Sequence, residues 1–342
     1  MDSRTKGALA AGQGLATAAR LRAAGLSDER LAALCRAGEL VAVRRGVYTS
    51  TELWDSWDEY VAQPLARIRA AELTLTSPHV FSHDSAAILH GLPLLRPDRA
   101  EVHVSRLDLR GRRSRYGIHH HGARFRADQV EVVQGLEVLD PARTVVDLAR
   151  EHGYRAGLVA ADGMLQLGLT RRDLWVAAEA MAGWPYSLTV NAVVADSDEG
   201  AESPGETLAR ELVLECGLGG TVETQFPVRT GAGIAWADLR VGRHLVEFDG
   251  RAKFRSTVDG GLREVDLEQL VWDERRRQHE MCAEGFGMTR LVYADYWGDR
   301  RERAIERLQQ ENAVTVARFG TALTPQQAEV AARLRGRRAK AG

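Results

Sequence analysis

Two segments near the start of the chain place apolar residues at the three- and four-residue spacing of an amphipathic helix. The first segment ends near Ala24, and its apolar positions are Leu9, Leu15, Ala18 and Leu21. The second segment runs from Ser27 to Gly38, and its apolar positions are Leu31, Leu34 and Cys35. Gly25 can end the first helix and Ser27 can cap the second, so the pattern predicts a helix-turn-helix.

A strand-like pattern follows the second helix. Residues 40–48 form two short apolar pieces on either side of Arg45-Gly46, which predicts a hairpin with arginines at its tip. A hairpin directly after a helix-turn-helix makes a winged helix, whose second helix reads a DNA groove and whose wing contacts phosphate. The residues expected to bind DNA are Arg30, Arg36, Arg44 and Arg45. A winged helix that binds a protein is the alternative.

The middle of the chain mixes both kinds of pattern, which predicts an α/β domain. Residues 82–91 and 141–149 favour helices, and residues 101–105 and 117–121 favour strands.

Three consecutive histidines lie on the second of these strands. Neighbours on a strand point to opposite faces, so only His119 and His121 of this run could share a metal ion. No cysteine or acidic cluster stands beside them to complete a site. The sequence therefore does not favour metal binding there.

A second hairpin is predicted around Gly242-Arg243, because glycine suits the first position of a type II′ turn. In that register Leu239 pairs with Val246, and Asp238 lies opposite Glu247.

Asp249 points to the same face as Glu247, so three carboxylates share one side of the hairpin. Like charges opposed in a sheet are destabilising, and a divalent cation would relieve the repulsion. Mg²⁺ prefers such oxygen ligands, and it can activate water and stabilise charge when a phosphodiester is cut. Asp238, Glu247 and Asp249 are therefore the expected ligands of Mg²⁺ or Mn²⁺, and solvated surface acids are the alternative.

Charge is distributed unevenly over a chain whose net charge is −1. Residues 1–50 hold eight Lys/Arg and four Asp/Glu, a net of +4, and residues 96–126 hold nine Arg and three acids, a net of +6. The end of the chain from Arg333 adds four Arg and one Lys without an acid. Separate basic patches on a nearly neutral protein are typical of local phosphate contacts, although solvated arginine-rich faces would give the same counts.

The expected location is the cytoplasm. No apolar run approaches the roughly 20 residues of a membrane helix, and the start of the chain lacks the apolar segment of a signal peptide. The three cysteines, Cys35, Cys216 and Cys282, show no C-x-x-C spacing and are expected to be reduced.

The first 180 residues resemble AbiEi-type antitoxins. The resemblance rests on the helix-turn-helix, on GELVAVRRGVY at 38–48, on SHDSAAILHGL at 82–92 and on PARTVVDLA at 141–149. It implies a transcriptional regulator that binds DNA, with a nucleotidyltransferase-type toxin as its partner.

Residues 195–310 resemble the PD-(D/E)XK nuclease superfamily, in the branch near very-short-patch-repair (Vsr-like) endonucleases. The shared pattern is SPGE at 203–206, an aspartate on the next strand, EFDG at 247–250, an arginine-rich helix and a closing strand. The resemblance implies metal ligands at Asp238 and Glu247, with Asp249 as an additional acid. It adds Glu206 from the helix, which its capping-box position explains equally well, and Arg277 as a DNA-phosphate or structural contact. The lysine of the superfamily motif is replaced by Asp249, and Lys253 is a displaced substitute that leaves catalysis in question.

The expected fold class is α/β in several domains (α+β multidomain). These are a winged helix at 1–50, an AbiEi-like middle domain at 51–185, a restriction-endonuclease-like mixed sheet flanked by helices at 186–312, and a basic tail at 313–342. The leading expectation for function is a Mg²⁺-dependent DNA endonuclease in phage defence or DNA repair. The alternative is an antitoxin or repressor whose nuclease fold is inactive.

Overall fold

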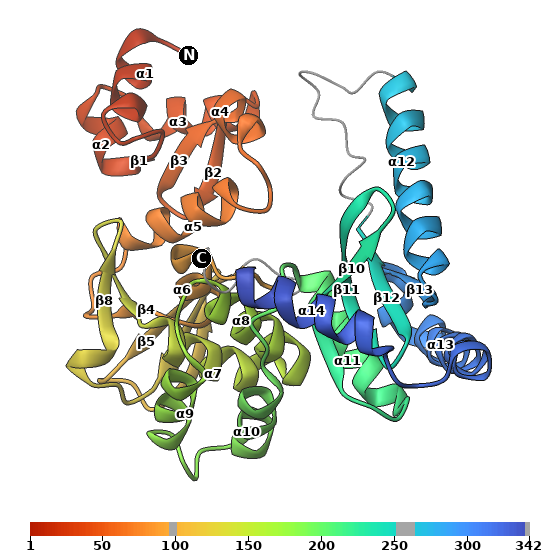
Figure 1. Ribbon diagram of the computed structural model, residues 1–342. Coiled ribbons are helices and arrows are strands. Elements are labelled where there is room, and N and C mark those ends of the chain that lie inside the picture. Colours follow the sequence, from red (N-terminus) through yellow and green to blue (C-terminus); the bar gives the residue numbers. More distant parts are fainter. Residues whose placement is uncertain (96–100, 251–263, 339–342) are drawn as a thin grey trace. The chain divides into compact units, whose positions relative to one another are not determined.

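The computed structural model describes residues 1–95, 101–250 and 264–338 (Figure 1). The chain divides into two compact units: the first comprises 1–164 and 168–196, and the second comprises 165–167 and 197–342. Helices and mixed sheets occur together in this multidomain chain, so the expected fold class is confirmed. Within the described residues, no helix combines the length and the apolar character needed to cross a membrane.

The first unit begins with the predicted winged helix. Its elements are α1 (Ser3–Ala10), β1 (Ala16–Thr17), α2 (Ala18–Ala23), α3 (Asp28–Arg36), β2 (Leu40–Arg44) and β3 (Val47–Ser50). The strands form an antiparallel sheet in the order β1-β3-β2. Gly46 at the tip of the β2–β3 hairpin has φ of 83°, a conformation that glycine adopts without strain.

The first predicted helix ends where expected, since α2 stops at Ala23, but its extent is wrong because the chain is broken between α1 and α2. Gln13 and Gly14 have φ of 53° and 90°, which no helix can continue through. Ala16 and Thr17 then pair with β3 as a short strand. Leu9, Leu15 and Leu21 are nevertheless all buried, so burial of the apolar positions was predicted while the element that buries them was not.

A larger domain completes the first unit, built on a six-stranded mixed sheet in the order β6-β7-β5-β4-β9-β8. Its strands are β4 (Val80–Phe81), β5 (Val102–Arg106), β6 (Gly111–Arg115), β7 (Ile118–Gly122), β8 (Val130–Val133) and β9 (Leu136–Leu139). The helices of this part are α4 (Thr51–Ser56), α5 (Ala62–Glu72), α6 (His83–His90), α7 (Pro141–His152), α8 (Tyr154–Gln166), α9 (Arg171–Glu179) and α10 (Ser187–Asp196), with a 3-10 turn at Ala127–Gln129.

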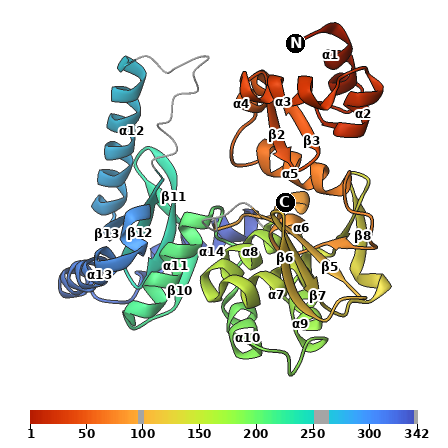
Figure 2. The same cartoon turned by 180° about the vertical axis from the view of Figure 1, so that it is seen from behind.

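Helices α6 and α7 pack on one another beside the sheet (Figures 1 and 2). The core between the sheet and helices α5 and α6 includes Phe81, Val104, Ile118 and Val138. The helices predicted over 82–91 and 141–149 and the strands predicted over 101–105 and 117–121 are confirmed to within about two residues.

The second unit contains a four-stranded sheet in the order β10-β11-β12-β13, in which β12 and β13 are parallel. Its elements are α11 (Pro204–Cys216), β10 (Val222–Thr230), β11 (Gly233–Val241), β12 (His244–Asp249), α12 (Glu264–Ala283), β13 (Gly287–Val292), a 3-10 turn (Tyr293–Tyr296), α13 (Gly298–Phe319) and α14 (Pro325–Arg338). Helices α11 and α13 pack on one another and on β12, whereas α14 packs on β10.

The β11–β12 hairpin has the predicted register, with Leu239 opposite Val246 and Val241 opposite His244. Gly242 has φ of 59°, and Arg243 is not among the residues with positive φ. One positive φ at the first turn position is the requirement of a type II′ turn.

The residues expected to form a basic tail from 313 belong instead to the end of α13, which continues to Phe319, and to α14, Pro325–Arg338. Ala331 of α14 is buried in a cluster with Phe226 of β10, and Leu334 is buried as well. These apolar residues fix the helix to the sheet, which the arginine-rich composition had obscured.

Candidate functional site

The helix-turn-helix presents the predicted recognition helix with its polar side outward. Ser27 caps α3 because its Oγ accepts a hydrogen bond from the backbone of Arg30, at 3.2 Å. Leu31 and Leu34 are buried, whereas Arg30 and Arg36 are exposed. The two arginines of α3 are thus exposed, as a contact with nucleic acid would require.

The two arginines of the wing differ in their surroundings. Arg45 is exposed at the hairpin tip, whereas Arg44 is half-buried and its Nε, which is buried, makes no hydrogen bond. Burial lowers the pKa of Arg44. Arg45 is therefore the wing arginine that is free to meet a phosphate.

The wing tip meets a second, arginine-rich hairpin, which lies within the basic patch at 96–126. The Arg45 guanidinium lies 5.0 Å from the ring centre of Tyr116, and that of Arg115 lies 4.8 Å from the same ring. Tyr116 and Gly117 form the turn between β6 and β7, and every residue of β6 is exposed. We call Arg45, Tyr116, Arg115 and Arg113 the arginine ridge. The run RRSRYG was the available sequence signal.

The acidic residues of the second unit lie around an irregularity in its sheet. Leu239 pairs with Thr224 of β10 and Ala237 pairs with Phe226, but the ladder is interrupted at Asp238 between them. The Asp238 carboxylate accepts a hydrogen bond from the backbone of Phe248 at 2.7 Å, so it turns toward β12 as expected.

Glu247 is engaged by an arginine, which the sequence analysis did not foresee. Its side chain is buried and its Oε2 lies 2.5 Å from Nη2 of Arg277 on α12. Nη1 of Arg277 donates to the carbonyl of Trp236 at 3.0 Å. The sequence analysis offered a DNA-phosphate contact or a structural contact for Arg277. In the structure its guanidinium makes structural contacts, with Glu247 and with the backbone of Trp236.

Glu206 is at the N3 position of the capping box that the sequence predicted, and half of that box forms. Ser203 caps the helix, whereas the Glu206 carboxylate accepts from the backbone N–H of Glu202 and not from that of Ser203. The backbone N–H of Glu206 donates to Oγ of Ser203 at 3.3 Å, and the Glu206 Oε1 accepts from the same hydroxyl at 2.8 Å. Burial, and then the charges of Asp295, Asp238 and Glu206, raise the pKa of Tyr296. The charges of Glu206 on α11 and of Asp238 on β11 thus both act on this phenol.

Asp249 is half-buried at the end of β12, and Lys253 lies outside the described residues. Within the described part of the chain, these acids do not form a group of three ligand atoms close enough for one metal ion. As arranged, with Glu247 held by Arg277, they do not fit a ready Mg²⁺ site.

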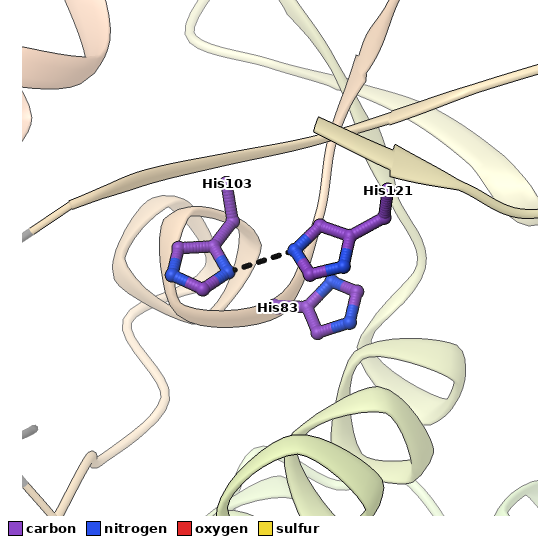
Figure 3. A group of neighbouring side chains, drawn as sticks. All are labelled: His83, His103 and His121. Carbon is purple, nitrogen blue, oxygen red and sulfur yellow. Dashed lines mark hydrogen bonds between the residues drawn. The ribbon is translucent and has the colours of Figure 1, made fainter. Parts of the chain in front are cut away.

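A histidine cluster in the first unit does bring three such atoms together (Figure 3). His83 begins α6, His103 is on β5 and His121 is on β7, and their ligand nitrogens lie within 4.8 Å of one another. Nδ1 of His103 is 3.1 Å from Nε2 of His121, and the rings of His83 and His121 stack with centres 3.8 Å apart.

Burial keeps these imidazoles neutral. It lowers the pKa of His103 to about 4 and that of His121 to about 3, and it lowers the pKa of His83 well below its ordinary value. Asp84 lies beside the cluster, with its Oδ2 3.5 Å from Nε2 of His103 and 2.7 Å from Nε2 of His152.

The histidine interpretation from the sequence is therefore corrected in two respects. His121 joins His83 and His103, whereas His119 contacts Glu101. An acid does stand nearby, but it is contributed by α6. The strand order places β7 next to β5, and that neighbourhood could not be read from the histidine run alone.

A cavity of about 250 Å³ opens beside the cluster. His83 and His121 line it together with Arg112, Arg150 and Glu151. Its wall thus combines two neutral imidazoles with cationic and anionic side chains.

Two segments of the chain match known family models. Residues 8–51 match the model described as "Transcriptional regulator, AbiEi antitoxin", and residues 80–183 match the model described as "AbiEi antitoxin C-terminal domain". None of the curated proteins compared matches the chain. Among solved structures, the crystal structure of the RV2827C protein from Mycobacterium tuberculosis is similar over 61% of this chain and 79% of its own, with 17% identity and a TM-score of 0.38.

Proposed function

We propose, from the two AbiEi-type segments, that this chain is a DNA-binding transcriptional regulator of the antitoxin kind. The segment at 8–51 matches a family model described as a transcriptional regulator, and it coincides with the helix-turn-helix and its wing. This was the alternative reading of the sequence, and the family matches favour it over the endonuclease.

The observation that carries the proposal is the arginine ridge. Arg45 of the wing and Arg115 of β6 lie on the same tyrosine ring, so the basic surface continues from the wing onto the neighbouring hairpin. A phosphate backbone that contacts the wing tip therefore meets further cations beside it, and phosphate contacts supply most of the sequence-independent affinity for DNA.

Binding to DNA is tested by fluorescence anisotropy with the labelled duplex upstream of the protein's own gene and with a shuffled duplex of the same composition. A regulator should bind the first duplex at least ten times more tightly, and binding to both should weaken as salt rises. Equal, salt-insensitive or undetectable binding would contradict the proposal and favour a winged helix that binds protein.

The proposed functional partner is a nucleotidyltransferase-type toxin, as the antitoxin resemblance implies. Its gene should lie beside that of this chain, and its expression alone should arrest growth. Co-expression of this chain should restore growth. If no neighbouring gene is toxic, the antitoxin role fails while the regulator role stands.

A magnesium-dependent nuclease is the second candidate, and it concerns the second unit. The observation in its favour is that Tyr296 connects the two acid-bearing elements: its hydroxyl donates to the carbonyl of Gly205, next to Glu206, at 2.9 Å. Its ring centre lies 5.9 Å from that of Phe248, whose backbone N–H donates to Asp238. Against it stands the Arg277–Glu247 ion pair, which occupies a carboxylate that the metal would need. Incubation of the protein with single-stranded, duplex and mismatched DNA in Mg²⁺, Mn²⁺ or EDTA decides between them. Metal-dependent cleavage that disappears in Asp238→Asn supports the nuclease, and an absence of cleavage removes it.

A further inference from the structure

We propose that His83, His103 and His121 bind one divalent transition-metal ion, for which zinc has the matching ligand chemistry. Imidazole nitrogens are preferred ligands of zinc, and three histidines with a fourth, open position form a known type of zinc site. The three residues come from α6, β5 and β7, so the ion would join three elements of the first unit.

The spacing of the nitrogens is close to what such an ion requires. Two nitrogens bound tetrahedrally at the usual zinc–nitrogen distance are about 3.4 Å apart. Nδ1 of His103 and Nε2 of His121 are 3.1 Å apart, and the ligand atoms of all three residues lie within 4.8 Å. The His83 ring now stacks on that of His121 (Figure 3), so His83 would have to leave this stack to direct its nitrogen at the ion.

The surrounding groups orient two of the rings for this purpose. The Asp84 carboxylate, 3.5 Å from Nε2 of His103, favours a proton on that nitrogen and leaves the lone pair of Nδ1 directed at His121. Metal-bound histidines commonly hold a carboxylate on their other nitrogen in this way. On His83, Nδ1 lies 3.0 Å from Oγ of Ser82, which leaves Nε2 for the ion.

The backbone at His83 is a second, independent indication. Its φ of 51° is in the left-handed region, which is costly for a residue with a side chain. Such conformations persist where the surroundings impose them, and they gather at binding sites. His83 and His121 also line the 250 Å³ cavity, so the fourth metal position would face that space and accept water or an anionic oxygen.

Cobalt is the probe that reports on this geometry. The untagged full chain, stripped with a chelator and dialysed, is titrated with Co²⁺ while visible absorption is recorded. We expect saturation at one equivalent, with the strong bands of four-coordinate cobalt, and loss of these bands when Zn²⁺ is added. Zn²⁺ should also raise the Tm, because a ligand of the folded state stabilises it.

Variants then assign the site. His121→Gln should abolish the cobalt bands, and Asp84→Asn should weaken cobalt binding about 10- to 100-fold. His79→Gln is the matched control, because His79 lies in the same unit and contacts Ser77 and Glu72 instead. Circular dichroism checks that each variant is folded.

Three results would overturn the proposal: no bound cobalt in the folded wild-type chain, weak bands typical of six-coordinate cobalt, or equal loss of binding in His79→Gln. The wild-type titration remains decisive even where His121→Gln fails to fold.

Discussion

At the scale of single residues, the two sites expected from the sequence differ in how their charges are balanced. Arg45 is exposed and has an aromatic ring beneath it, whereas Glu247 is buried and already paired. An exposed cation gains from binding phosphate, and a buried pair loses stability when either member is removed alone.

The arginine ridge gives the first prediction. Arg45→Ala with Arg115→Ala should weaken binding to all duplexes about equally and reduce the slope of log K against log salt by up to about 1.8, since each lost phosphate contact removes about 0.9. Arg172→Ala, an exposed arginine of α9, is the control and should leave the slope unchanged. Anisotropy at four salt concentrations measures it, and an unaltered slope in the double variant would place DNA elsewhere.

The ion pair of Glu247 gives the second prediction. Arg277→Gln should lower the free energy of unfolding by about 1–3 kcal/mol, because a buried carboxylate loses its charged partner. Glu247→Gln in the same chain should restore much of that loss. Urea unfolding of the wild type, the two single variants and the double variant measures the coupling energy between Arg277 and Glu247.

The same cycle tests the acids as metal ligands. If Asp238 and Glu247 can hold Mg²⁺, the ion should raise the Tm of Arg277→Gln more than that of the wild type, because it replaces the guanidinium. Glu247→Gln should remove that response. Identical, negligible shifts in all proteins would show that these carboxylates are structural.

At the scale of elements, buried histidines connect strands to helices in both units. In the second unit, Nδ1 of His244 on β12 lies 2.7 Å from Oγ1 of Thr315 on α13. Its Nε2 lies 2.9 Å from Oγ1 of Thr289 on β13. Both contacts are buried, and burial lowers the pKa of His244 to about 4.

This connection predicts a dependence of stability on pH. The folded pKa is below the unfolded value of about 6.5, so the contribution of the neutral ring is complete above pH 6.5 and is lost as pH falls toward 4. His244→Gln should flatten the dependence in that window by up to about 1.4 kcal/mol per pH unit, the value for one proton. Denaturant midpoints from pH 7 to 4 measure it, with the exposed His279→Gln as control. Parallel curves for wild type and His244→Gln would refute it.

At the scale of the whole molecule, the division into two units falls at Asp196 and Ser197. Helix α10 ends there, and its Val190, Val193 and Val194 are buried with the first unit. The sequence analysis placed the domain boundary at residue 186, and helix α10 moves it to the residues after 196.

A glutamate-specific protease should therefore make its first cut at Glu199 or Glu202, which are exposed just beyond the helix. The fragment that follows has its own sheet and core and should remain folded by circular dichroism. Mass spectrometry locates the cut. A first cut elsewhere, or an unfolded fragment, would mean that the units depend on one another.

The local patterns of the sequence predicted the helices, strands and turns better than they predicted the contacts between distant residues. The helix-turn-helix, the wing and the register around Gly242-Arg243 follow from spacing and turn chemistry within a few residues. Arg277 and Glu247 are 30 positions apart, and His103 and His121 of the histidine cluster are 18 positions apart. Helix packing and the order of the strands bring these residues together. No period in a single sequence encodes such neighbourhoods.

The turn at Tyr116-Gly117 carries a consequence for how the protein tolerates change. Both residues have positive φ, 52° and 73°, as a two-residue type I′ turn requires. Asparagine or glycine would relieve about 1 kcal/mol at the first position, where a tyrosine is strained. Selection for thermal stability without selection for function should therefore favour replacement of Tyr116. Arg45 and Arg115 would then lose the aromatic ring that both of them contact. If the arginine ridge binds DNA as proposed, such stabilised variants should bind it more weakly, so stability and DNA affinity should trade against one another at position 116.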